Sequence, residues 1–507
     1  MKLTNLLNTD FENLNLKDDN IRNFFIKLIN KNIKNQKVDL EKNLSNIIKV
    51  VHLFSNDPLI PQEDVLEKLS ITKNELIEIN SIIRNNSELQ NIILKMGSGE
   101  RYWNSILPFA KNTKNVLNDV YGFPLRIAFF PGVSCMFYCG FCGRNQDAKY
   151  PSNVAEIGIN KLKSVIDEIN VGSTAISISG GLEPLTNQYL GSFISHTKNK
   201  GLRVPLITNA YSLTSGYIKK NPGLWDLDSL RVSLYGVDEN TYDFVTRSKR
   251  SYKMVSKNII EFLKIRKAKN KKVKLGLNFI VLKENIKDIK KLCDFIYMIN
   301  KQSETEIDFL TLREDFGSVT GHSNNLDKER KYRLEGILDT EDRKNLLNEL
   351  NYLEDFKKKY FPKMNIDYGY ALNGLINNKL DYHLVRAEDN EVTKRGYSQL
   401  SVAIDLLGDV FLYREAGFLN REGNKDYIIG RIEKNKTLKD VISSHLRNYK
   451  ETYHKDSNRF LDSFDHLMTK LVTQASKDKE FGIPFESGPV MSRTEKVNID
   501  LGNNWYS

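Results

Sequence analysis

Residues 125–142 read LRIAFFPGVSCMFYCGFC, an apolar run followed by cysteines in the spacing C-x3-C-x2-C. The apolar run 125–130 predicts a buried β-strand. Cys135, Cys139 and Cys142 then place three of the four thiols of the chain within eight residues. Thiolates suit zinc or an iron–sulfur cluster, and a four-iron cluster held by three protein ligands keeps one iron open for another ligand. The spacing therefore favours one such cluster.

Zinc and a disulfide remain as alternatives to the cluster. A structural zinc site needs a fourth ligand at short spacing, and the nearest histidines, His52 and His196, are far away in the chain. A disulfide requires an oxidising compartment, but the N-terminal residues lack a signal-peptide core. We expect a cytoplasmic protein with reduced thiols, and a structural role for the fourth cysteine, Cys293, which lies in a helical pattern.

The cysteine spacing, with the aromatic Phe141 before the third cysteine, resembles the motif of the radical S-adenosylmethionine (SAM) superfamily. The resemblance implies one [4Fe–4S] cluster on Cys135, Cys139 and Cys142, with SAM on the open iron and Phe141 beside its adenine. In this family a reduced flavodoxin or ferredoxin supplies the electron that cleaves SAM. The resulting 5′-deoxyadenosyl radical abstracts a hydrogen atom from the substrate.

Length and charge limit the remaining classes. At 507 residues the chain is long enough for two or three units. No apolar run approaches the roughly 20 residues of a membrane span, so we expect no membrane partner. The net charge of +11 suits an anionic partner. However, the lysines are scattered and no aromatic-interleaved basic motif accompanies them, so we do not expect nucleic acid binding.

Three regions follow from the pattern of apolar residues. Residues 1–115 have helical spacing and predict an N-terminal helical domain, with a capping box at 72–75. Residues 116–320 alternate short β-rich runs with helical stretches, which indicates an α/β unit with parallel strands. Residues 321–507 predict helices and a β-hairpin at 399–413, an α+β extension that lacks cysteines for an auxiliary cluster. The extension resembles that of many radical SAM enzymes, and this resemblance implies that it shapes the substrate pocket.

Six strands are expected in the middle region. This number matches the partial (β/α)6 TIM-type barrel of the superfamily that the cysteine motif resembles, in which functional groups lie at the carboxyl ends of the strands. The expected strands are 125–130, 174–179, 203–208, 229–234, 274–281 and 306–312.

Polar groups after these strands are candidate SAM contacts. The segment 180–184, GGLEP, resembles the superfamily's G-G-E-P segment with Leu182 inserted. A strand-end asparagine offers a donor and an acceptor, and an arginine can pair with the SAM carboxylate. The candidates, each also explicable as an ordinary loop residue, are Gly180, Gly181, Glu183, Asn209, Ser233 and Arg247.

Charged residues near the sixth strand and the hairpin are candidate substrate contacts. Carboxylates can move a proton, and arginines bind phosphate bidentately. Solvated surface charge is the alternative for each. The catalytic candidates are Glu314, Asp315 and Glu415, and the substrate-binding candidates are Arg313, Arg414 and Arg421.

Segments 129–144 and 179–187 most resemble those of radical SAM enzymes that act on amino sugars in natural-product biosynthesis. This resemblance implies hydrogen abstraction from an amino sugar, nucleotide-linked in our interpretation, and deamination to a deoxy-keto sugar. One alternative is a dehydrogenase that oxidises a sugar or aminocyclitol hydroxyl to a ketone. Others are a peptide- or RNA-modifying radical SAM enzyme and a non-enzymatic metal-binding regulator.

Overall fold

The computed structural model describes residues 19–32, 40–57, 59–95, 109, 112–139, 141–144, 147–314, 340–378, 385–393, 395–449 and 457–477. The predicted catalytic residue Asp315 lies outside these residues. The described part contains one ten-stranded sheet in the order β10-β9-β8-β1-β2-β3-β4-β5-β6-β7. Strands β1 to β8 are mutually parallel where they pair, whereas β9 and β10 are antiparallel additions.

The six expected strands are all present in the expected order. Apolar, β-branched and aromatic residues dominate them, which favours buried strands in a sheet covered by helices. They are β1 (Arg126–Phe130), β2 (Ala175–Ile178), β3 (Pro205–Thr208), β4 (Ser229–Leu234), β5 (Lys274–Val281) and β6 (Phe309–Glu314).

Two further parallel strands extend this set beyond residue 320. β7 (Asn365–Tyr368) pairs with β6, and β8 (Ser401–Asp405) pairs with β1. The expected hairpin is present, because β8 also pairs with β9 (Asp409–Phe411), and Gly408 turns between them with φ +85°. β10 (Ile428–Arg431) closes this edge. The sheet thus draws on both the predicted barrel and the predicted extension.

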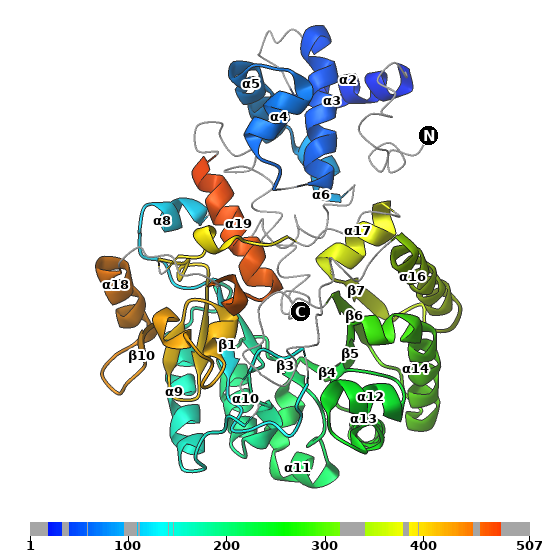
Figure 1. The fold of residues 1–507 in the computed structure, drawn as a ribbon, viewed down its shortest axis with the longest axis vertical. Helices are drawn as coiled ribbons and strands as arrows, with labels where there is room; N and C mark the ends of the chain where they lie inside the picture. The colour runs from blue at the N-terminus through cyan, green and yellow to red at the C-terminus, as the bar shows by residue number, and fades with distance from the viewer. Residues whose placement is uncertain are drawn as a thin grey trace.

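Helices cover the convex face of the curved sheet (Figure 1). Outward-facing strand residues such as Ile127, Leu230 and Leu277 share one apolar core with residues of these helices. The helices on this side and at the edges are α9 (Val154–Glu168), α10 (Leu190–Asn199), α11 (Ser215–Lys220), α12 (Glu239–Thr246), α13 (Ser251–Ala268), α14 (Ile289–Ser303), α16 (Thr340–Tyr360), α17 (Tyr370–Asn378) and α18 (Leu438–Asn448).

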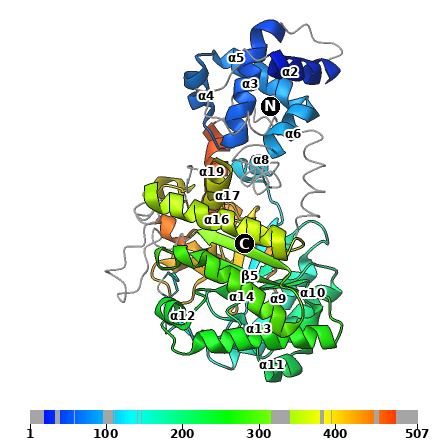
Figure 2. The same ribbon diagram turned by 90° about the vertical axis from the view of Figure 1, so that its right-hand side faces the viewer.

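The N-terminal helices form a cluster on the side where the sheet stays open (Figures 1 and 2), and their buried apolar residues join those of β1 and the C-terminal region in one core. Helix α19 (Ser463–Lys477) extends from the sheet toward this cluster and contacts α8 (Thr113–Leu117). The expected capping box is confirmed, because Thr72 and Glu75 satisfy each other's backbone at the start of α5. The cluster consists of α2 (Asp19–Asn32), α3 (Leu40–Asn56), α4 (Gln62–Leu69), α5 (Lys73–Arg84) and α6 (Ser87–Lys95).

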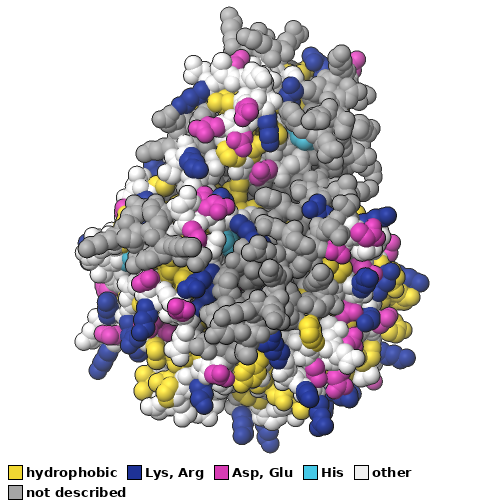
Figure 3. Space-filling view, in the orientation of Figure 1, with side chains coloured by type: hydrophobic (Ala, Val, Ile, Leu, Met, Phe, Trp, Pro, Cys, Tyr) yellow, Lys and Arg dark blue, Asp and Glu magenta, His cyan; other side chains and the backbone are white. Residues whose placement is uncertain are grey.

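On the face in Figure 3, Lys and Arg side chains are interspersed with Asp and Glu. Among the described helices, none combines the length and the apolar character that crossing a bilayer requires. Cys293 lies on α14 with its side chain buried in the apolar core, as expected for a structural thiol.

Candidate functional site

The cysteine loop begins directly after β1 and is fixed by main-chain bonds. The Cys142 N–H donates to the carbonyl of Cys139 at 3.1 Å, and the Tyr138 N–H donates to the carbonyl of Thr246, the last residue of α12, at 2.8 Å. The guanidinium of the buried Arg144 donates to the carbonyl of Phe137. The loop is therefore held from both sides before any ligand binds.

The three thiols lie in a buried, weakly cationic environment. Burial raises the pKa of the Cys135 thiol to about 11 and also raises the pKa of Cys139 and Cys142, while the charge of Arg144 opposes each rise. Bound iron holds such thiols as thiolates. Three cysteine thiols from one loop are a donor set that suits an iron–sulfur cluster with one open iron.

A pocket of about 160 Å³ lies against the cysteines. It brings together predicted residues from four separate strand ends and one residue of the C-terminal extension. The predicted residues on its wall are Cys135, Cys139, Cys142, Phe141, Gly180, Gly181, Glu183, Asn209, Ser233 and Arg414.

The two glycines after β2 are required by close packing. A Cβ on Gly180 would lie 2.5 Å from the carbonyl oxygen of Leu182, and a Cβ on Gly181 would lie 2.5 Å from the Phe418 ring. Both distances are too short for the Cβ that any other residue type would place there. Phe418 belongs to the extension, so the extension packs directly on the predicted SAM loop.

Glu183 is a buried brace between two strand ends. Its carboxylate accepts from the backbone N–H of Leu185 at 3.0 Å and of Asn209 at 2.8 Å, and from the Thr208 hydroxyl. Burial raises its pKa, and these three donors oppose the rise. The inserted Leu182 is buried in a small apolar cluster. The insertion therefore leaves Glu183 on the wall of the pocket.

The remaining strand ends provide a polar group and an aromatic layer. Asn209 Nδ2 lies 3.2 Å from Met136 Sδ, and its Oδ1 accepts from the Tyr211 N–H at 2.9 Å. Ser233 hydrogen-bonds Tyr235, whose ring centroid lies 5.2 Å from that of Phe141. Phe141 thus stands on the pocket wall against a second aromatic ring.

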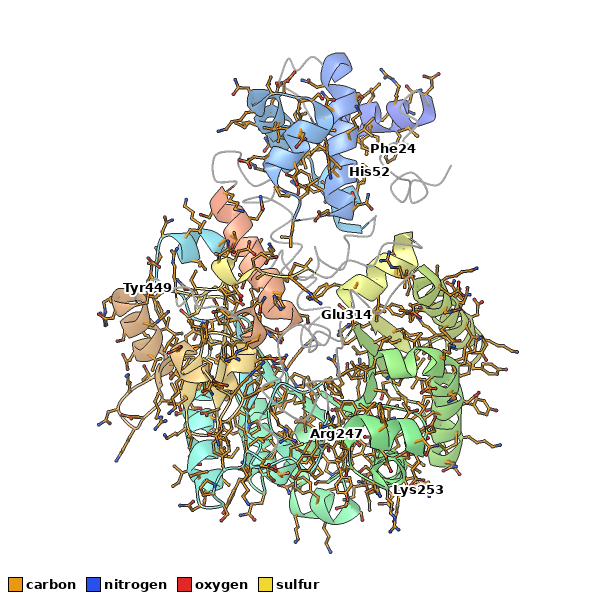
Figure 4. All side chains as sticks on the ribbon, in the orientation of Figure 1. Phe24, His52, Arg247, Lys253, Glu314 and Tyr449 are labelled. Carbon is orange, nitrogen blue, oxygen red and sulfur yellow. The ribbon has the colours of Figure 1, made fainter. Side chains whose placement is uncertain are left out.

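Arg247 is placed differently from the other predicted SAM contacts. It ends α12 with φ +54° and follows Thr246, which holds the cysteine loop, but it is not among the pocket-lining residues. Figure 4 shows Arg247 well separated from Glu314. The structure therefore does not bring Arg247 to this pocket.

The charges at the end of β6 point to opposite sides, as alternation predicts. Arg313 forms an ion pair with Asp367 of β7 at 2.5 Å. Glu314 is buried at the start of α17, where its Oε1 lies 3.4 Å from the Ala371 N–H. A carboxylate is favourable at a helix N-terminus. Glu314 thus faces α17 and is not among the pocket-lining residues.

Arg414 connects the pocket to α19. Its guanidinium donates to the Ser179 hydroxyl at 2.8 Å and pairs with Asp462 at 2.9 Å, while its backbone N–H donates to Asp465. The half-buried Asp462 carboxylate also accepts from the backbone N–H of the buried Asp465 at 2.8 Å. The arginines lower the pKa of Asp462 despite its burial, and burial with the adjacent Asp462 charge raises the pKa of Asp465.

Glu415 and Arg421 lie behind the cysteine loop. They form an ion pair at 2.6 Å, and Arg421 also donates to the carbonyl of Arg459 at 2.6 Å. The Arg421 side chain is fully buried. A Cβ on Gly143 would lie 2.7 Å from the Arg421 guanidinium, so the pair supports the loop after Cys142. Neither residue is among those that line the pocket.

The sequence interpretation gave no role to several residues of the site. Arg144, Tyr235 and Ser179 all line the pocket. A basic residue two positions after the third cysteine was a signal for Arg144. Ser179 ends one predicted strand and Tyr235 follows another, but neither residue carried such a signal.

A cysteine loop after the first strand of an open parallel barrel, facing a Gly-Gly loop and polar strand ends, defines a class of enzyme. The radical SAM superfamily model matches residues 129–296, and the chain belongs to this superfamily. It is a radical SAM enzyme, and the family implies SAM and a [4Fe–4S] cluster.

One relative resembles nearly the whole chain. The dTDP-4-amino-4,6-dideoxy-D-glucose ammonia-lyase of Streptomyces venezuelae is 32% identical over 445 residues, which cover 86% of this chain and 88% of the relative. Among solved structures, Streptococcus suis SuiB bound to precursor peptide SuiA matches with a TM-score of 0.42 and 17% identity, over 65% of this chain and 67% of that one. A histidine-tagged anSMEcpe with bound AdoMet matches with a TM-score of 0.40 and 14% identity, over 63% of this chain and 80% of that one.

Proposed function

We propose that the protein is a radical SAM ammonia-lyase that converts a nucleotide-linked amino sugar to a deoxy-keto sugar. One observation supports this proposal above the others: the similarity to the amino-sugar ammonia-lyase covers 86% of the chain, far beyond the matched barrel segment 129–296. The extension that packs on the cofactor loop through Phe418 and Arg414 is the part expected to shape the substrate pocket.

The chain's own residues fit the two cofactors. Cys135, Cys139 and Cys142 would hold the cluster, and the pocket beside them would hold SAM. When bound, the two groups supply a 5′-deoxyadenosyl radical that takes a hydrogen atom from the substrate. The glycine loop would present backbone groups to SAM, and Phe141 with Tyr235 would exclude water from one wall.

The proposed reaction removes ammonia from the sugar. A hydrogen atom leaves the carbon that bears the hydroxyl, and a base takes the hydroxyl proton. The adjacent C–N bond, to a protonated amino group, then breaks with both of its electrons going to nitrogen, which leaves as ammonia. The remaining carbon radical takes one electron and one proton, and a reduced flavodoxin or ferredoxin supplies that electron. Of the three sequence-based candidates for the base, Glu314 faces α17, Glu415 pairs with Arg421, and Asp315 lies outside the described residues.

The arginines differ in how well they suit a diphosphate. The side chains of Arg414 and Arg313 are 18% and 12% exposed, whereas that of Arg421 is 0% exposed. A diphosphate contact requires an accessible guanidinium. We therefore favour Arg313 and Arg414 for this role and assign Arg421 to support of the cysteine loop.

The test uses the full chain, reconstituted anaerobically with iron and sulfide. With SAM, a one-electron reductant and a dTDP-linked 4-amino sugar, we expect ammonia, 5′-deoxyadenosine and a deoxy-keto sugar. Cys139→Ala should give none of them. A ketone that retains its nitrogen would identify a dehydrogenase instead. SAM cleavage that no amino sugar stimulates would overturn the proposal and favour a peptide or RNA substrate.

A further inference from the structure

The concave face of the sheet is organised in layers. Along each strand, side chains alternate between the convex apolar core and the concave face. Leu230, Leu277 and Leu310 belong to the convex core. Their neighbours Arg231 and Thr311 therefore face inward.

One inward layer is filled by the protein itself. Strand register pairs Arg231 with Gly276 and Gly276 with Phe309. The Arg231 guanidinium lies 5.7 Å from the Phe309 ring centroid, and a Cβ on Gly276 would lie 2.2 Å from that ring. Phe309 therefore covers the glycine, and this layer forms a floor.

The next layer toward the carboxyl ends is polar on four consecutive strands. Register pairs Ser233 with Asn278, Asn278 with Thr311, and Thr311 with Asp367. Ser233, Asn278 and Thr311 stand two positions after Arg231, Gly276 and Phe309, the three residues of the floor. Asp367 stands two positions after Asn365. We call Ser233, Asn278, Thr311 and Asp367 the polar row. Its first member, Ser233, also lines the pocket beside the cysteines.

The row has unused hydrogen-bonding capacity. The Thr311 side chain is fully buried, and its hydroxyl has no hydrogen-bond partner among the described residues. Such a group costs stability unless a ligand or water completes it. Asn278 is half-buried. Arg313 lies one layer above Thr311 and pairs with Asp367, so the far end of the row is charged.

We propose that the polar row binds the hydroxyl and amino groups of the substrate sugar. The half-buried Asn278 is its direct contact, and the buried Thr311 hydroxyl meets the sugar only after binding has moved the side chains that cover it. This inference rests on the proposed function and names the residues that orient the sugar. Neighbouring strands are about 5 Å apart. Asn278 and Thr311 therefore lie about one and two strand spacings from Ser233, within reach of a sugar held beside the cofactor pocket.

The experiment compares Thr311→Val and Asn278→Ala with Ser177→Ala. Valine keeps the branched shape of threonine and removes only a hydroxyl that has no partner among the described residues. Ser177 is a matched control, because its buried hydroxyl also has no partner among those residues, but it lies on β2, outside the polar row, and is not among the pocket-lining residues. The readouts are melting temperature, SAM affinity, and KM for the dTDP-linked amino sugar.

We expect Thr311→Val to leave the melting temperature and SAM affinity unchanged and to raise KM about three- to ten-fold, the loss of one hydrogen bond. Asn278→Ala should raise KM by a similar factor, and Ser177→Ala should not. Unchanged KM in both row variants would overturn the inference while the proposed function stands. A wild-type enzyme that neither binds nor converts any amino sugar would refute the proposed function, and the inference with it.

Discussion

Removing the Glu183 carboxylate should loosen the cofactor pocket at the join of two strand ends. Glu183→Ala leaves the N–H groups of Leu185 and Asn209 without their acceptor, together with the Thr208 hydroxyl. A buried donor without a partner costs about 1–3 kcal/mol, but removing the desolvated carboxylate recovers part of this cost. We expect a loss of about 2–4 kcal/mol in the free energy of unfolding.

Glu183→Gln gives a graded version of the same change. The amide oxygen can keep the bonds from Leu185 and Thr208, which both reach Oε1, but its NH2 group then faces the Asn209 N–H. One hydrogen bond is lost, which corresponds to about 1–2 kcal/mol. Asn209 lies beside the cysteines, so both variants should also weaken SAM binding.

The assay is urea unfolding followed by circular dichroism, with SAM binding measured on the reconstituted protein. Glu168→Gln is the matched control, because Glu168 also accepts two backbone N–H bonds, from Leu438 and Lys439, but lies away from the pocket. It should cost stability without changing SAM affinity. If Glu183→Ala shifts stability by less than about 0.5 kcal/mol and SAM affinity stays the same, the bracing role is wrong.

Three further outcomes are expected. Reconstituted protein should bind about four irons per chain. Cys139→Ala should lose iron and SAM cleavage, and Cys293→Ala should keep both. Loss of iron and SAM cleavage in both variants to the same extent would contradict the assignment of the cluster ligands. Arg414→Ala should weaken SAM or substrate binding more than Arg247→Ala, because only Arg414 lines the pocket; the reverse order in titrations would refute this. Burial raises the pKa of Asp405 to about 6, so the contribution of this carboxyl to folding stability is present at low pH and lost as pH rises through about 6. Asp405→Asn should remove up to about 3 kcal/mol of this pH dependence from the free energy of unfolding, measured at about pH 4–7. A variant with the same pH profile as the wild type would contradict this prediction.

Short contiguous segments allowed the sequence to predict the chemistry. Cys135, Cys139 and Cys142 lie in one loop, so their spacing alone constrains a common ligand. The six strands were predictable because apolar runs of about four to eight residues bury on both faces of a helix-covered sheet. Gly180 and Asn209 were predictable because the carboxyl ends of parallel strands meet at one edge.

Pairing between distant segments was decided only by the tertiary structure. Sequence reasoning made Glu415 a catalytic candidate and Arg414 and Arg421 substrate-binding candidates, but Arg414 reaches Ser179 while the other two pair behind the cysteine loop. β8 was expected only as one arm of a hairpin, yet it also pairs with β1. Register likewise aligned Asn278 with Thr311. Local pattern specifies which face a residue prefers, but the partner on that face depends on how segments hundreds of residues apart pack together.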